Sequence, residues 1–442
     1  MRNCFLVGLS LVVGAGRMAA ENEFAATNAV AISPVWIDAL TDEAQTNYPA
    51  LRAAELRADA ALWNAAAVPM WEDPVAKFGV MGADRERRSS DGDLIYGAEQ
   101  RLPLFGKPGA ARAVAQAEAI TLRHEAAYRA QQLRRDLVRQ LIKIALQNRV
   151  LDLGREDLAS LDTIVATTED KYRNGLATQV EVLQSQNERA KRANFLRTDE
   201  NLLRADQSSL NRLLNRKPDS PWPKLLLPPV VPALPPLAEM VRHATETAPQ
   251  LEVVRASLRQ ANAAVEFARK RRLPDVGVGV EGRQYSETGR FREGTIVLGF
   301  SIPWGNRSRY AADIRREQRR AEATEYEIAD MQLSLRDEIT RLVIQIENAQ
   351  REAALYRTDI IPRTQQTIDS AHANWLNNRA ALRDLLEARR MLIEARTAES
   401  RAIAEQHSIL TDLSLHCGMA ELREFTRNDL RPAREPAKGG NP

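Results

Sequence analysis

Residues 274–304 read PDVGVGVEGRQYSETGRFREGTIVLGFSIPW, and this stretch decides the class of fold. Apolar residues alternate with glycine or polar residues on both sides of a turn around Thr288–Arg290, which is the period of a β-strand. The pattern therefore predicts a β-hairpin with one apolar face. The residues that share this face are Val276, Val278, Val280, Ile296, Leu298, Phe300 and Ile302.

A second hairpin with the same alternation is predicted at about residues 74–104, around a turn at Ser90–Gly92. Two isolated hairpins have too little apolar surface to form a stable globular sheet by themselves. If strands from several subunits join edge to edge and the apolar faces meet lipid, every backbone group is paired and no edge remains. The alternative is a small soluble β-subdomain between helices. The residues on the apolar face here are Ala76, Phe78, Val80, Leu94, Tyr96 and Ala98.

The two hairpins belong to an internal repeat of the chain. Prolines recur 200 residues apart, at positions 49 and 249 in the helical segments and, at the strand borders, at 74 and 274 and at 103 and 303. Chance similarity between alanine-rich helices does not explain shared prolines at these borders. We therefore predict a first repeat at 21–217 and a second at 237–418, joined by a linker at 218–236 that is too rich in proline for a helix or a central strand.

Each hairpin is followed by a very long helical segment and its return, at about 108–216 and 308–416. The outgoing segments contain almost no Gly or Pro and would each extend about 100 Å at 1.5 Å per residue. Pro362 is expected to interrupt the second one. A single helix cannot bury its own apolar seam, so these long helices must pack against their return helices and neighbouring subunits. The seam residues are Leu133, Leu137, Leu141 and Ile144 in the first repeat, and Leu335, Ile339, Leu342, Ile346, Ala349 and Ala353 in the second.

The ends of the chain have the composition of processing and tail segments. Residues 1–20 combine an early positive charge, a short apolar run and small residues, which predicts a secretory signal peptide cut near Ala20. An N-terminal membrane anchor is the alternative, but the run falls short of the roughly 20 apolar residues that span a bilayer. Removal of the signal leaves Cys417 without a partner for a disulfide. Residues 419–442 predict a loose polar tail.

Composition and motifs argue against several functional classes. The net charge is only +3 with no basic block among aromatics, so no nucleic acid partner is expected. The sequence contains no Walker-type phosphate loop and no constellation of nucleophile and base, so we expect neither an enzyme nor a cofactor. The five histidines show no ligand spacing with Cys417 or with carboxylates, so no bound metal is expected.

Three motifs resemble the TolC-like family of outer-membrane efflux proteins. They are QRLPLFGK at 100–107, YRNGL at 172–176 and VEVLQS at 180–185. The resemblance covers about residues 30 to 418 and includes the duplication. The Phe105–Lys107 stretch is most similar to the branch that exports cobalt, zinc, cadmium or copper.

The resemblance implies a mainly α fold with a small β part, in which three copies form a 12-stranded outer-membrane β-barrel continued by a periplasmic α-helical barrel. It implies an outer-membrane channel that conducts heavy-metal cations passively in a tripartite efflux system. The expected partners are two further copies of the chain, a periplasmic adaptor, an inner-membrane pump of the resistance-nodulation-division type, and outer-membrane lipid. Drug efflux, type I protein secretion, or a periplasmic coiled-coil structural or adaptor protein remain alternatives.

The resemblance also points to the helical tips as the functional region. It places a pore constriction or gate at Asp384, Glu387, Glu181 and Trp375, and adaptor docking at the turns that hold Gly175, Leu176, Asn378 and Arg379. A positive φ is expected at Gly175, where it has no steric cost, and at the equivalent Asn378, since asparagine is the next most tolerant residue. Asp384 and Glu387 are three residues apart and therefore lie on one helix face. On charge pattern alone they would be a solvated face between Arg383 and Arg389. Trp375 stands where relatives carry a tyrosine that can form a hydrogen bond, and Ala380 stands where some carry a latch arginine. Packing is therefore expected to hold the gate more than ionic links.

Overall fold

The structure is a computed structural model that describes residues 29–80, 94–231, 234–285 and 288–419. The predicted signal peptide, the hairpin turn at 90–92 and residues 420–442 of the predicted tail lie outside the described residues. The chain divides into two compact units. One comprises residues 1–49, 130–244 and 337–442, and the other comprises 50–129 and 245–336.

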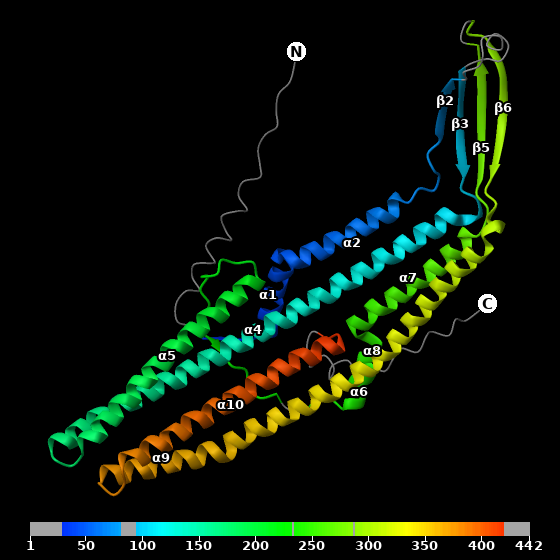
Figure 1. Ribbon diagram of the computed structural model, residues 1–442. Helices are drawn as coiled ribbons and strands as arrows, with labels where there is room; N and C mark the ends of the chain where they lie inside the picture. The colour runs from blue at the N-terminus through cyan, green and yellow to red at the C-terminus, as the bar shows by residue number, and fades with distance from the viewer. Residues whose placement is uncertain (1–28, 81–93, 232–233, 286–287, 420–442) are drawn as a thin grey trace, which may run out of the picture. The chain divides into compact units, whose positions relative to one another are not determined.

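The elements follow the duplicated order that the sequence predicts, and the fold is mainly helical (Figure 1). In the first half they are β1 (Val30–Ala31), α1 (Pro34–Asn47), α2 (Pro49–Ala67), β2 (Val75–Val80), β3 (Leu94–Leu102), α4 (Lys107–Arg173), α5 (Gln179–Leu213) and β4 (Leu225–Leu226). In the second half they are α6 (Leu237–Thr247), α7 (Pro249–Arg271), β5 (Val276–Gln284), β6 (Phe291–Phe300), α8 (Arg307–Leu355), α9 (Ile361–Leu376) and α10 (Leu382–Cys417). Short 3₁₀ turns, Leu104–Gly106 and Pro303–Asn306, precede α4 and α8.

The two hairpins join in one antiparallel sheet with the strand order β2-β3-β5-β6. The register sets Phe78 opposite Tyr96, and Ala98 opposite Val280, so the apolar faces of both hairpins coincide. That face is open, since the Phe78 side chain is 84% exposed and that of Ile296 is 75% exposed. The opposite face carries the charged residues Lys77, Glu99, Arg101, Glu281, Arg283 and Glu293. Pairing between β3 and β5 was not foreseen, because alternation within a hairpin does not say which strand lies beside it.

Both long helices form as predicted, and they differ in continuity. Helix α4 runs unbroken for 67 residues. Helix α8 ends at Leu355, a π-helical turn follows at Tyr356–Ile360, and α9 contains Pro362 near its start. The Ile361 N–H donates to the Tyr356 carbonyl, and the wider turn accommodates a proline that has no N–H of its own. All ten predicted seam residues are buried, none more than 4% exposed.

The proline-rich linker holds one feature that the sequence analysis missed. Leu225 and Leu226 form β4, which pairs in parallel with β1. Lys224 fixes the same segment to α4 through an ion pair of 2.7 Å with Asp152. The strand pair and the ion pair attach the linker to β1 and α4, and the prolines around them have no N–H that would need an acceptor. Within the described residues, no helix combines the length and the hydropathy that crossing a membrane requires.

Cys417, the last residue of α10, offers a chemical test of this packing. Its side chain is fully buried, and burial raises the pKa of its thiol to about 12. Only the thiolate reacts, and the rise in pKa from an ordinary value of 9.0 lowers the reactive fraction at neutral pH by about a thousandfold. We expect maleimide to leave the folded protein unlabelled over the time in which it labels the SDS-denatured chain. Ser209→Cys, at an exposed position on α5, is the positive control. Equal labelling of Cys417 before and after denaturation would contradict the packing.

Candidate functional site: the helical tips

The first tip connects α4 to α5 through a tight turn. Gly175 has a φ of 72°, a left-handed conformation that glycine adopts without steric cost, and the Leu176 N–H donates to the Lys171 carbonyl at 2.8 Å. Helix α5 then begins with a capping box. The Thr178 N–H donates to Glu181 Oε2 at 2.7 Å, and the Glu181 N–H donates to Thr178 Oγ1 at 3.3 Å. Glu181, a predicted latch residue, therefore caps its own helix in the single chain.

The second tip, between α9 and α10, has the same geometry with asparagine in place of glycine. Asn378 has a φ of 58°, and the Arg379 N–H donates to the Asn374 carbonyl at 2.8 Å. The positive φ expected at Gly175 and Asn378 is thus confirmed. Helix α10 begins after Ala381, which supplies no side-chain cap, and Asp384 is the acidic residue in its first turn. A carboxylate at this position complements the positive end of the helix dipole.

Lys171, near the end of α4, ties the two tips together. Its Nζ donates to Asn378 Oδ1 at 2.9 Å and also to the Trp375 carbonyl oxygen. The same Nζ lies 4.6 Å from the centroid of the Trp375 ring, in a cation–π contact. The lysine thus adds a second donor at the end of α9, where the Trp375 carbonyl also accepts from the Asn378 N–H at 3.1 Å. One side chain thereby couples the turns that the resemblance assigns to adaptor docking.

Trp375 is the hydrophobic anchor of this arrangement. Its side chain is 3% exposed and packs in a cluster with Ile164, Leu382 and Leu385. The ring therefore acts within the chain by packing α9 against α4 and α10.

Asp384 and Glu387 occupy an exposed face of α10. Glu387 pairs with Arg390 at 3.4 Å, and Arg390 also approaches Glu188 of α5 at 3.7 Å. These pairs are open to water and contribute little to stability. Asp384 has no ion pair among the described residues, so its charge faces solvent uncompensated.

A buried charge cluster lies on the same helices, deeper than the tips. Asp157 of α4 is 9% exposed and is held by Arg389 of α10 and by Arg192 of α5, whose Nε lies 3.1 Å from Asp157 Oδ2. Arg389 Nη2 also donates to the Asp157 carbonyl at 2.8 Å. Burial raises the pKa of Asp157 and lowers the pKa of Arg389, while their mutual attraction opposes both shifts.

Gly154, three residues before Asp157, allows α5 to approach α4 closely. A Cβ at this position would lie 2.5 Å from Arg192 Nη2 and 2.9 Å from Leu196 Cδ1. The glycine thus provides the space in which Arg192 reaches the carboxylate. Three helices meet at this one carboxylate group.

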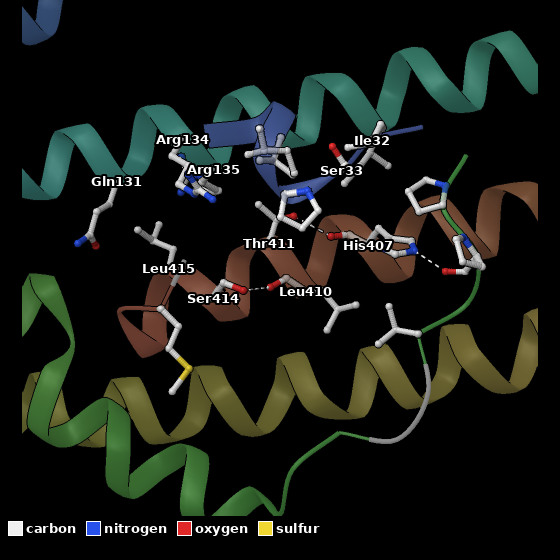
Figure 2. A pocket seen from close by; sticks show the side chains of 18 of the residues that line it. Ile32, Ser33, Gln131, Arg134, Arg135, His407, Leu410, Thr411, Ser414 and Leu415 are labelled. Atoms are coloured by element: carbon white, nitrogen blue, oxygen red, sulfur yellow. Dashed lines mark hydrogen bonds between the residues drawn. The ribbon is translucent and has the colours of Figure 1, made fainter. Parts of the chain in front are cut away.

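A cavity of about 810 Å³ lies elsewhere in the same unit, between α10, the middle of α4, the start of α1 and the linker (Figure 2). His407 contacts the Pro229 carbonyl at 2.8 Å, and burial lowers the pKa of its imidazole. The arginines at its rim are already paired, Arg134 with Asp38 at 2.6 Å and Arg135 with Asp136 at 2.7 Å. The cavity therefore presents apolar walls rather than free charge. Within the part of the chain that the structure describes, no three His, Cys, Asp or Glu side chains are grouped to hold a metal ion.

The sequence predicted the tips as the functional region, but not the residues whose contacts fix the tip helices against one another. Lys171, Asp157, Arg192 and Arg389 were not singled out, because isolated charges on a charge-rich helix look like a solvated face. Gly154 was the one available signal, since a glycine inside a helix often marks a close approach.

Solved structures share this fold. The outer-membrane channel OprN matches with a TM-score of 0.74 at 17% identity, over 86% of this chain and 89% of that one. The outer membrane protein VceC from Vibrio cholerae matches with a TM-score of 0.73 at 17% identity, over 87% and 96%. CusC matches with a TM-score of 0.74 at 14% identity, over 90% and 96%. The duplicated halves and paired tips thus define a protomer with the TolC-like fold.

The family follows from the sequence model for outer membrane efflux proteins, which matches residues 40–216 and again 240–418. The chain belongs to the outer membrane efflux protein family. As a member of this family, it is a non-enzymatic outer-membrane channel of a tripartite efflux system, with a periplasmic helical extension. No curated protein sequence matches the chain. Channels of this family trimerise and work with an adaptor and an inner-membrane pump.

Proposed function

We propose that three copies of this chain assemble into one channel that exports heavy-metal cations. Two features of the sheet support the trimer. Strands β2 and β6 are edges within one chain, and the apolar face formed by residues such as Phe78 and Ile296 is open. Three sheets joined edge to edge would pair the free backbone groups, and outer-membrane lipid would cover the apolar face.

The observation that carries the choice of cargo is the exposed pair of carboxylates on α10. Threefold symmetry would turn Asp384 and Glu387 into two stacked acidic rings at the tips, and acidic rings attract cations and repel anions. The Phe105–Lys107 stretch, which is similar to the metal-exporting branch, points the same way. Trp375, and Glu181 once it leaves its capping box, would set how far the tips approach one another.

The turns at the tips are the proposed docking surface for a periplasmic adaptor, with the inner-membrane pump supplying the energy. Leu176 is 59% exposed, and Gly175, Asn378 and Arg379 are exposed beside it. An exposed leucine at a turn can bury its side chain in a partner at low cost. Lys171 holds both turns in one arrangement before the partner arrives, which lowers the entropic cost of binding.

Deletion of the gene tests this proposal. We expect the deletion strain to become more sensitive to at least one of zinc, cadmium, cobalt or copper, by about fourfold or more in minimum inhibitory concentration, and to remain unchanged toward organic dyes. A plasmid copy should restore tolerance, whereas Leu176→Asp should not, although its conductance in planar bilayers stays normal. Loss of dye tolerance alone would assign the channel to drug export and overturn the metal proposal.

A further inference from the structure

The unit that contains the sheet also contains a concentration of basic side chains where the strands leave it. Helix α7 ends in Arg269, Lys270 and Arg271, and Arg272 follows as its C-terminal cap; all four are exposed. Helix α8 begins with exposed arginines at 307 and 309 and has no acidic residue in its first turn.

Hydrogen bonds fix these two basic segments at the same level of the structure. The Asp275 N–H, three residues after Arg272, donates to Ser301 Oγ at 2.6 Å, and the Ser301 N–H donates to the Asp275 carbonyl at 2.8 Å. Lys107, the first residue of α4, pairs with the Asp275 carboxylate at 2.6 Å. Figure 1 shows the end of α7 and the starts of α4 and α8 together at the end of the sheet. Residues far apart in sequence therefore form one basic collar, which we define as Lys270, Arg271, Arg272, Arg307 and Arg309.

The collar is not neutralised within the described part of the chain. The nearby carboxylates of Glu266 and Asp275 are engaged by Arg269 at 2.5 Å and by Lys107 at 2.6 Å. Glu72 pairs with Arg101 at 3.4 Å. Asp313, four residues after Arg309 on α8, is engaged by Arg316 at 3.2 Å. Asp73 adds one exposed negative charge against the five positive charges of the collar. Arginines in the first turn of α8 also oppose the helix dipole, so an anion beside them would relieve an unfavourable arrangement.

Exposed apolar side chains at the same level show the kind of surface that the collar faces. Trp304, between β6 and α8, is 73% exposed, and Trp71, before β2, is 59% exposed. Phe105, between β3 and α4, is 46% exposed. Aromatic side chains with this placement are typical of the boundary between hydrocarbon and headgroups. The apolar face of the sheet begins directly beyond them, with Phe300 and Ile302 exposed by 62% and 68%.

We propose that the collar binds the headgroups of anionic phospholipids in the periplasmic leaflet of the outer membrane, and so fixes the depth at which the sheet sits in the bilayer. The required ligand is a phosphodiester beside an acyl chain, since the cationic groups border an apolar surface. The proposal depends on the outer-membrane location and not on the exported cargo. A failed metal-export test would leave it intact.

Native mass spectrometry of the detergent-purified protein, with an equimolar mixture of phosphatidylglycerol and phosphatidylcholine, tests the proposal. We expect the wild type to prefer phosphatidylglycerol by about fivefold or more, and to lose most of the preference as salt rises from about 0.1 to 1 M. Excess inorganic phosphate should leave the preference in place, because it lacks the acyl chain.

A matched pair of variants locates the effect. The collar variant changes Arg271, Arg272, Arg307 and Arg309 to Gln and should bind both lipids equally. The control variant changes four exposed arginines on α4, α5 and α10 to Gln and should keep the preference; they are Arg149, Arg197, Arg204 and Arg401. A collar variant with wild-type preference, or a control variant that loses it equally, would overturn the proposal. So would a wild type with no preference at low salt, or one whose preference is abolished by phosphate, whether or not the variants fold.

Discussion

Neutralising both exposed carboxylates of α10, by Asp384→Asn with Glu387→Gln, should lower the permeability ratio of cations over anions by about fivefold to tenfold. Two unit charges 4 Å apart interact by about 1 kcal/mol in water, and by more where a narrow entrance excludes water. An energy difference of about 1.4 kcal/mol changes an equilibrium ratio tenfold. Asp384 should account for the larger share, because Glu387 is paired with Arg390. Reversal potentials across planar bilayers in a potassium chloride gradient give the ratio directly.

Two controls make this result specific. Asp384→Glu with Glu387→Asp keeps the charge and should keep the selectivity. Asp42→Asn with Asp219→Asn removes two exposed carboxylates from α1 and the linker, away from the tips, and should leave selectivity unchanged. The effect of the tip variant should also fade between about 0.1 and 1 M salt, because the screening length falls from roughly 10 Å to 3 Å. Wild-type selectivity in the tip variant would remove the acidic rings from the mechanism.

Arg389→Gln should lower the free energy of unfolding far more than the neighbouring change Arg390→Gln. It leaves Asp157 buried with one arginine instead of two. Removing one partner of a buried ion pair costs about 3 to 5 kcal/mol when the remaining charge has no other partner, so the retained Arg192 should bring the loss to the lower end of this range, about 3 kcal/mol. The neighbouring change Arg390→Gln removes only exposed pairs and should cost less than about 1 kcal/mol. Hydrogen exchange in the segments around Asp157, Arg192 and Arg389 would report the opening free energy of each variant. Equal protection in the two variants would show that the buried cluster does not hold the helices.

The pH dependence of Arg389→Gln follows from the same carboxylate. Burial already raises the Asp157 pKa, and losing an arginine raises it further. A group whose folded pKa is raised destabilises the fold when it is charged, so the deficit should be greatest at neutral pH. It should shrink as pH falls toward the pKa of Asp157. Asp157→Asn combined with Arg389→Gln should recover part of the stability, because no buried carboxylate then lacks an arginine. The recovery should be incomplete, because Arg192 also loses its partner.

The predictions from sequence succeeded where the pattern is local. Alternation at Val276–Val280 and Ile296–Phe300 is a property of adjacent residues, and the structure confirms both strands and their shared face. The spacing of Leu137, Leu141 and Ile144 likewise depends only on helix geometry, and all three are buried. The positive φ of Gly175 and Asn378 follows from turn chemistry.

Contacts between residues that are distant in the chain were not predicted. The contact between Lys171 and Asn378 spans 207 positions, and that between Asp157 and Arg389 spans 232. On helices this rich in charge, no local signal separates the few charges that become buried from the many that stay in water. The pairing of β3 with β5 and the parallel contact of β1 with β4 are absent from the sequence reading for the same reason.

The sequence by itself determined the duplicated order of elements, the apolar face of each hairpin, the helix lengths and the turns at the tips, because each depends on residues within one or two turns of one another. Only the tertiary structure decided which strands share a sheet, which carboxylate is buried, and which basic residues gather where the sheet ends. Those outcomes depend on which charged side chains become buried. Burial is decided by packing between segments that are distant in the chain, so no short stretch of sequence reveals it.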